Sequence, residues 1–423
     1  METTMQTKKK EPLLSSLLLL FMLAMILANV GGHMYGPLMP LYLEHLNADV
    51  LQIGLFFTLS QVIPLALQIL GGWISDTLGR LRSIALGSIG GLIGYIGFVV
   101  SPNWQWLLLA VTFTSVSSSL VGPSFDAFIA ENSSEHNRAR VFGITQALFM
   151  IVAVVGPLLG GWLADDYGYK FMLLIAACLY LLATLIRIGM ARAAARGRES
   201  HPEKLTVASL KTNLGAMFGM LVSGGLITWI MLTDGVRDTA FALSGNLEPL
   251  YMQDVAGLSV KQIGVINSIF GLFMMLFTVP GGWLADKKGE RVGIALGFGL
   301  VFVGLLLFIA PQAVLLTFYL SWALFGIGVG LLSPAYSSLI SKAVPEKLRG
   351  TAFGLFSTSL GLISLPAPAI GAMLWERFNP RLPFQITAAV VLLTILPVIF
   401  KFKLPQEDAT EVAALAAEMT IKA

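Results

Sequence analysis

The sequence predicts an all-α integral membrane fold, with twelve transmembrane helices in two pseudo-symmetric six-helix halves. Three observations lead to this prediction: a shortage of charge, long apolar blocks and an internal repeat. Of the 423 residues, 56% are hydrophobic and only 12% are charged, whereas a soluble domain carries about 25% charged residues. Lipid is the solvent that tolerates such a composition, and a continuous segment inside it satisfies its backbone groups as a helix.

The apolar residues come in twelve blocks. Each block is long enough to cross a hydrocarbon core of about 30 Å. The first block is too long for a cleaved signal peptide. In chain order, the expected spans are 14–40, 50–75, 83–101, 106–130, 141–164, 171–190, 222–247, 261–285, 292–311, 314–340, 351–375 and 382–402.

The basic residues predict the orientation of these spans. Lys170, Lys261, Arg377 and Arg381 lie in loops on one side, and nearly all other Lys and Arg residues lie in the remaining loops and the two tails. Because cytoplasmic loops carry the excess of positive charge, we expect both termini in the cytoplasm and the protein in the cell (inner) membrane. These loops account for the net charge of +3, so no nucleic-acid partner is expected.

A hydrophilic stretch at 191–212 separates spans six and seven. It predicts an N-terminal six-helix half at 1–190, a cytoplasmic linker at 191–220, a C-terminal half at 221–403 and a cytoplasmic tail at 404–423. The halves also share sequence. Pro40-Leu41-Tyr42 returns as Pro249-Leu250-Tyr251, an offset of 209, and Ile84 to Gly87 return as Ile294 to Gly297, an offset of 210. Pro123 and Pro157 return as Pro334 and Pro368, an offset of 211.

The loop after span two reads GGWISDTLGR, and the loop after span eight reads GGWLADKKGER. In spacing, loop and side of the membrane, both stretches resemble the signature loop of the major facilitator superfamily. The resemblance covers essentially the whole chain. It implies two parallel repeats that rock about a site near the middle of the membrane, at the interface of the halves.

The resemblance also implies that these loops latch the halves together on the cytoplasmic side. Asp76 is then expected to cap the start of span eleven near Gly350–Thr351, and Asp286 to do the same for span five near Arg140–Val141. Arg80 is expected to bridge Asp76 and Glu131. In the second half Glu290 replaces the arginine and Lys342 replaces Glu131, so an ion pair with inverted sign is expected. The expected latch residues are Gly72, Asp76, Gly79, Arg80, Arg82, Glu131, Gly282, Asp286, Gly289, Arg291 and Lys342.

Span five, GITQALFMIVAVVGPLLGG, is similar to the glycine-proline motif of antiporters in this superfamily. Gly143, Gly156, Pro157, Gly160 and Gly161 match the motif, and Val152 departs from it. The motif favours antiport over uptake, although any tightly packed span also favours Gly and Pro.

Four ionisable residues inside the spans have no counterpart in the other half. They are Asp126 in span four and Asp234, Arg237 and Asp238 in span seven. Such groups cost at least about 2.5 kcal/mol to insert, so they usually serve function. We expect Asp234 or Asp238 to carry a coupling proton and Arg237 to position the partner or an anionic group of the substrate. The alternative is a structural salt bridge.

Asp126 and His33 are further candidates for proton coupling. The alternative role of His33 is an interhelical hydrogen bond. The candidates for the substrate cavity are Arg237, Asn29, Tyr35, Gln61, Gln146 and Asn267.

No metal cluster, nucleophile–base pair or phosphate-binding loop occurs in the sequence, so we expect neither an enzyme nor a cofactor. The expected function is proton-coupled export of amphiphilic or drug-like molecules by alternating access, driven by a proton gradient. An uptake symporter for a sugar, organic anion or other metabolite is the alternative, and a lipid-headgroup translocase is a third reading. The expected partners are a small-molecule substrate, protons and the bilayer, with a monomeric chain.

Overall fold

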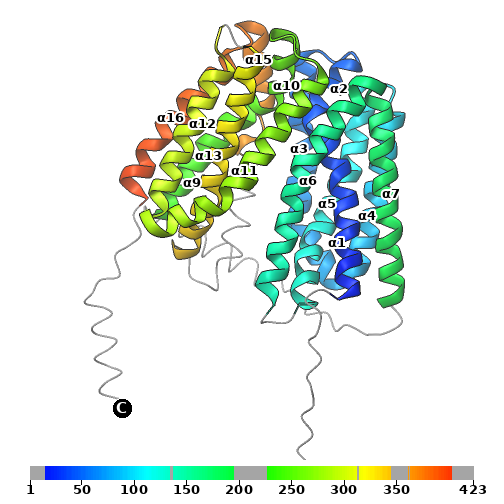
Figure 1. Ribbon diagram of the computed structural model, residues 1–423. Helices are drawn as coiled ribbons and strands as arrows, with labels where there is room; N and C mark the ends of the chain where they lie inside the picture. The colour runs from blue at the N-terminus through cyan, green and yellow to red at the C-terminus, as the bar shows by residue number, and fades with distance from the viewer. Residues whose placement is uncertain are drawn as a thin grey trace, which may run out of the picture.

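The computed structural model describes residues 15–133, 137–194, 226–311, 314–343, 361 and 363–402 (Figure 1). For residues 66–78, 123, 139, 194, 227 and 343 it describes the backbone alone. Within these ranges every regular element is helical, and nine helices are long and apolar enough to cross a membrane. The expected linker and tail lie mostly outside the described residues.

The first half forms one bundle. Its helices are α1 (Ser16–Tyr35), the short 3₁₀ turn η1 (Gly36–Leu38), α2 (Met39–His45), α3 (Val50–Leu78), α4 (Arg80–Val100), α5 (Trp104–Glu131), α6 (Arg138–Tyr167) and α7 (Tyr169–Ala194). They follow the six expected spans closely. The first span is longer than expected, because η1 and α2 continue α1 in nearly the same direction (Figure 1).

The second half forms a second bundle beside the first (Figure 1). It contains α9 (Leu226–Ser244), η2 (Gly245–Leu247), α10 (Glu248–Leu250), η3 (Tyr251–Val255), α11 (Val260–Lys288), α12 (Glu290–Phe308), α13 (Leu315–Ala343), α15 (Ala367–Arg377) and α16 (Leu382–Lys401). The turns after α9 repeat those after α1. Of the span expected at 351–375, α15 covers the part from Ala367 onward.

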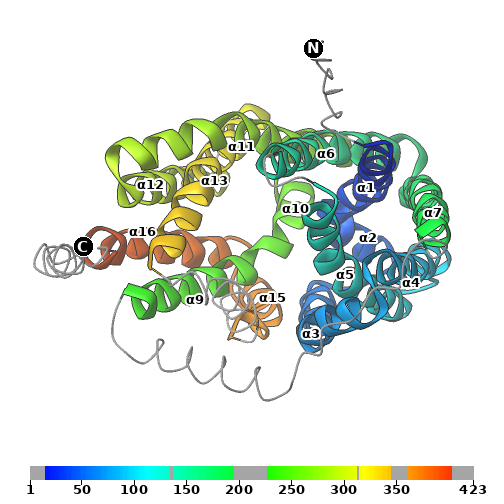
Figure 2. The same cartoon turned by 90° about the horizontal axis from the view of Figure 1, so that it is seen from below.

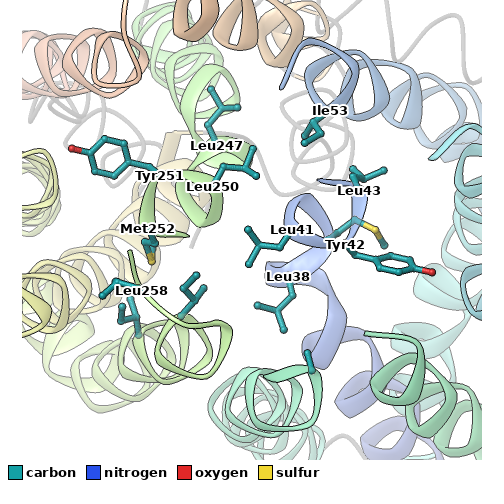
Figure 3. Close-up of a cluster of buried hydrophobic side chains, with 14 of the residues drawn as sticks. Leu38, Leu41, Tyr42, Leu43, Ile53, Leu247, Leu250, Tyr251, Met252 and Leu258 are labelled. Carbon is teal, nitrogen blue, oxygen red and sulfur yellow. The ribbon is translucent and has the colours of Figure 1, made fainter. Parts of the chain in front are cut away.

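The two bundles meet at the end of the molecule that carries α2 and α10, called here the closed end, and diverge toward the other end (Figure 1). The repeated segments form this closure. Leu38 and Leu41 face Leu250 across the interface, whereas Tyr42 and Tyr251 point into their own halves (Figure 3). All five side chains are buried in one apolar cluster shared by the halves. Burial of this surface favours the closed arrangement.

Two helix pairs also join the halves, α6 with α11 and α3 with α15 (Figure 2). Glycines allow the close approach. A Cβ at Gly161 would lie 2.8 Å from the Cα of Gly264, and a Cβ at Gly54 would lie 2.7 Å from the carbonyl oxygen of Pro368. The Thr58 hydroxyl adds a hydrogen bond, because it accepts from the backbone N–H of Ala369 at 3.2 Å.

Candidate functional site

The charged residues of span seven form a compact cluster on α9. Nη1 of Arg237 lies 2.9 Å from Oδ1 of Asp234, and Nη2 lies 2.7 Å from Oδ1 of Asp238. Nε of Arg237 also donates to the same oxygen of Asp238 at 2.9 Å. The spacing of three and four residues places all three side chains on one side of the helix. The sequence therefore identified a true contact group.

Aromatic rings from two other helices surround this cluster. The guanidinium carbon of Arg237 lies 5.5 Å from the ring centre of Phe298 on α12 and 5.3 Å from that of Tyr336 on α13. Such contacts stabilise a desolvated cation. Asp234 is buried, and its Oδ1 accepts no hydrogen bond from the described residues despite the ion pair. Asp238 differs, because its side chain is 38% exposed.

The first half holds a pocket of about 490 Å³ between α1, α4, α5 and α7. Three candidates from the sequence line it: Asn29, Tyr35 and Asp126. The amide of Asn29 donates to the carbonyl of Met25 at 2.9 Å. Asp126 is exposed on α5. These three residues therefore share one pocket in the first half, whereas the charged cluster on α9 lies in the second half.

Sequence reasoning missed the most unusual residue of this pocket, Arg187. It lies inside the expected span 171–190, so its charge should have been counted as intramembrane. The residue is 4% exposed, and its Nη1 donates to the Ser88 hydroxyl at 2.9 Å. It also lies next to the Tyr180 hydroxyl, which shares a 2.9 Å hydrogen bond with Ser117. The sequence signal was its position inside an expected span, where a charge is costly.

The remaining polar candidates lie elsewhere. Nδ1 of His33 lies 2.9 Å from the carbonyl oxygen of Asn29 in its own helix, and its Cβ packs against Gly156 of α6. Asn267 lines a small cavity at the closed end. Gln61 on α3 is partly buried, and Gln146 on α6 is exposed. None of these four lines the pocket of the first half.

The glycine-proline motif of span five lies at two packing interfaces. A Cβ at Gly156 or Gly160 would collide with His33 or Met34 of α1, and one at Gly161 would collide with α11 of the other half. The carbonyl of Pro157 contacts Gly264 at the same crossing. Gly143 is different, because a Cβ there would meet nothing within 4 Å. Most of the motif therefore has a packing role, and part of it joins the halves.

The motif loops contain the expected ion pairs within each half. Nε of Arg80 lies 3.1 Å from Oε1 of Glu131. In the second half, Lys342 pairs with Glu290, which also accepts a hydrogen bond of 2.8 Å from Ser338. The pair thus persists with inverted sign, as the sequence predicts.

Glycine in these loops has a backbone reason. Gly79 and Gly289 end α3 and α11 with φ of 85° and 92°, where a side chain would be strained. Gly282 is one of the expected latch residues, but it is not the glycine that lets a neighbouring helix approach closely. The close helix approach occurs at Gly281, where a Cβ would lie 2.5 Å from the carbonyl oxygen of Gly330, whereas Gly282 has ordinary spacing.

The latch contacts expected between the halves differ from the ion pairs within each half. Asp286 is exposed and forms no ion pair or hydrogen bond in the described part of the chain, so it does not reach the start of α6 in this conformation. Arg82 and Arg291 are likewise exposed. The side chains of Gly72 and Asp76, and the segment Gly350–Thr351, lie outside the described residues.

The comparison with protein families decides the identity of the fold. The model of the Major Facilitator Superfamily matches residues 20–233 and again residues 231–420. The chain belongs to the major facilitator superfamily. It is an integral membrane transporter, and the two matches correspond to its two bundles.

Relatives and solved structures agree with this assignment. The quinolone resistance protein NorA of Staphylococcus aureus is 25% identical over 385 residues, covering 88% of this chain and 94% of NorA. An uncharacterised MFS-type transporter of Methanocaldococcus jannaschii, MJ1317, is 25% identical over 380 residues, covering 88% and 92%. The structure of the nucleoside transporter NupG superposes with a TM-score of 0.76 at 14% identity, covering 92% of this chain and all of NupG. This last likeness shows the fold alone.

Proposed function

We propose that this transporter exports amphiphilic, drug-like molecules in exchange for protons that enter. The main support is the cluster on α9, where two carboxylates face one guanidinium and leave one negative charge in excess. The similarity to a quinolone resistance protein supports export of drug-like cargo.

The excess charge provides a physical basis for exchange. A proton on Asp238 and a cationic group beside it each neutralise the same charge, so one disfavours the other. Asp238 is the accessible member of the cluster, whereas Asp234 is buried against Arg237. Because of this competition, binding of a proton on the outer side promotes release of the cargo there. On the cytoplasmic side, binding of the cargo promotes release of the proton.

The conformation suits a step in this cycle. The bundles are closed at the end that the basic residues assign to the outside, and they diverge at the end assigned to the cytoplasm (Figure 1). We infer an inward-facing state in a cell membrane, with both termini in the cytoplasm. A single chain in the bilayer supplies both halves of the carrier, and the proton gradient supplies the energy without a cofactor.

The proposal is tested in proteoliposomes that contain a pH-sensitive dye. Norfloxacin and tetraphenylphosphonium are supplied as cargo, and proton movement is recorded for wild type, Asp234→Asn and Asp238→Asn. We expect proton flux opposite to the cargo, reduced about tenfold or more in Asp238→Asn because the exposed carboxylate of the cluster is gone.

Asp166→Asn is the matched control, since Asp166 is an exposed acid at the far end of α6. It should leave the flux unchanged. Proton flux in the same direction as the cargo would favour the symporter instead. Cargo movement without proton flux in wild type would contradict the proposed coupling.

A further inference from the structure

An arginine lies at matching depth in each half, as judged from the repeat-related residues that the two arginines contact. Arg237 packs over Phe298, and Arg187 donates to Ser88. Ser88 and Phe298 are repeat partners, since each follows the repeated segment Ile-Ala-Leu-Gly by one residue. The two arginines come from different helices, α7 and α9. Each nevertheless reaches the same level of its own bundle.

The two arginines differ in how their charge is balanced. Arg237 is paired with two carboxylates. Arg187 has hydroxyl neighbours and no ion pair with any acid in the described part of the chain. A buried guanidinium without a counter-ion is costly, and its residual positive charge faces the pocket of the first half.

The walls of this pocket fit an aromatic body. The rings of Tyr95 and Tyr180 are stacked at 4.5 Å, and Tyr35 meets Tyr95 edge-on at 5.5 Å. All three rings line the pocket, which has a volume of about 490 Å³, within the range of small-molecule sites. Arg187 lies at the level of Ser88 and Tyr180.

Asp126 gives the pocket a second charge of opposite sign. It forms no ion pair with Arg187 and is exposed on α5. Ser117, which contacts Tyr180 beside Arg187, precedes Asp126 by nine residues on the same helix, and this corresponds to about 13 Å along the axis. An anionic group is therefore repelled near Asp126 and attracted near Arg187, which orients it within the pocket.

We propose that Arg187 is the anion-binding end of a substrate subsite in the first half, and that this subsite takes aromatic amphiphiles bearing a carboxylate or a comparable anionic group. The guanidinium supplies charge-assisted hydrogen bonds to that group, and the tyrosine rings contact its aromatic body. This inference depends on the proposed export in one respect, which is the choice of a quinolone as one of the probes.

The test measures binding to the purified full-length protein in detergent, where neither a gradient nor transport is needed. The probes are three carboxylates, norfloxacin, 1-naphthoate and 1-naphthylacetate, each compared with its methyl ester by equilibrium dialysis. We expect wild type to bind at least one carboxylate about tenfold more tightly than its ester. Arg187→Gln should lose that preference while ester affinity stays within about twofold, and Arg187→Lys should keep part of it.

Arg192→Gln is the matched control, because Arg192 is an exposed arginine near the end of the same helix. It should retain the full preference. Glutamine at 187 can still donate to Ser88, and gel filtration with a melting curve verifies the fold of each variant. Equal loss of carboxylate and ester affinity in Arg187→Gln, or the absence of carboxylate preference in wild type for all three pairs, would overturn the proposal. Because no proton flux is measured, failure of antiport leaves this result intact.

Discussion

At the scale of single residues, a carboxyl group distinguishes the closed end of the second half from that of the first. Glu248 occupies the repeat position of Met39, since each precedes the repeated Pro-Leu-Tyr segment. It lies in α10, which continues α9 as α2 continues α1, and lines a cavity of about 130 Å³ together with Pro37 and Asn267. Pro37 comes from the first half, so closure of the bundles places this carboxyl between groups of both halves.

The position of Glu248 predicts that its charge opposes closure. A carboxylate that loses hydration when the bundles meet costs more free energy than a neutral amide of similar size. Glu248→Gln should therefore lower the open fraction. Spin-label distances between Asn47→Cys and Val255→Cys, in a Cys178→Ala background, measure it. An unchanged distance distribution in Glu248→Gln would contradict the prediction.

At the scale of helices, α6 is the element through which the closed end holds together. Its Gly161 approaches Gly264 of α11 so closely that a side chain has no room. Gly161→Val should therefore separate α6 from α11 and disfavour closure, by about 1 to 3 kcal/mol as for other overpacked contacts. The same spin-label pair should then report longer distances, and transport should fall.

Gly143→Val is the natural control for this prediction. It adds the same side chain to the same helix at a site with no neighbour within 4 Å. Closure should remain intact in this variant. Equal effects of the two substitutions would mean that the loss of glycine in α6, and not the α6–α11 contact, causes the change.

At the scale of the whole molecule, the halves share a latch geometry in which the charges are exchanged. Arg80–Glu131 in one half corresponds to Glu290–Lys342 in the other. Because the Lys342 side chain is 52% exposed, we expect the second pair to contribute less than about 1 kcal/mol. Lys342→Glu should lower the melting temperature more than Lys342→Gln, since it places a second negative charge beside buried Glu290.

Adding Glu290→Arg to Lys342→Glu reproduces the charge order of the first half. The double variant should recover most of the melting temperature lost in Lys342→Glu. Failure to recover would show that the two latches are not equivalent in geometry. Differential scanning fluorimetry of the purified proteins is sufficient for the comparison.

Much of this architecture could be predicted from the sequence, because apolar length and an internal repeat are properties of the chain itself. The contact between Arg237 and its two aspartates was also predictable from helical spacing. Which helix faces which is not encoded in periodicity when all faces are apolar. For that reason the pocket around Arg187 and the close approach at Gly281 became evident only in three dimensions. Gln61 and Gln146 were grouped with Asn29 and Tyr35, although they do not line the same pocket.

The apolar cluster at the closed end has an electrical consequence. A dry, packed seal conducts poorly. If water enters between the diverging ends of the bundles, most of the membrane voltage falls across the cluster of Leu38, Leu41 and Leu250 (Figure 3). A charge bound between the bundles then stays near the potential of the open side as long as the closed end remains closed. When the closed end opens and the other end closes, the charge crosses the electric field, which is worth about 2.3 kcal/mol per elementary charge at 100 mV. Turnover should therefore vary with voltage to a degree that reveals the net charge of the loaded carrier.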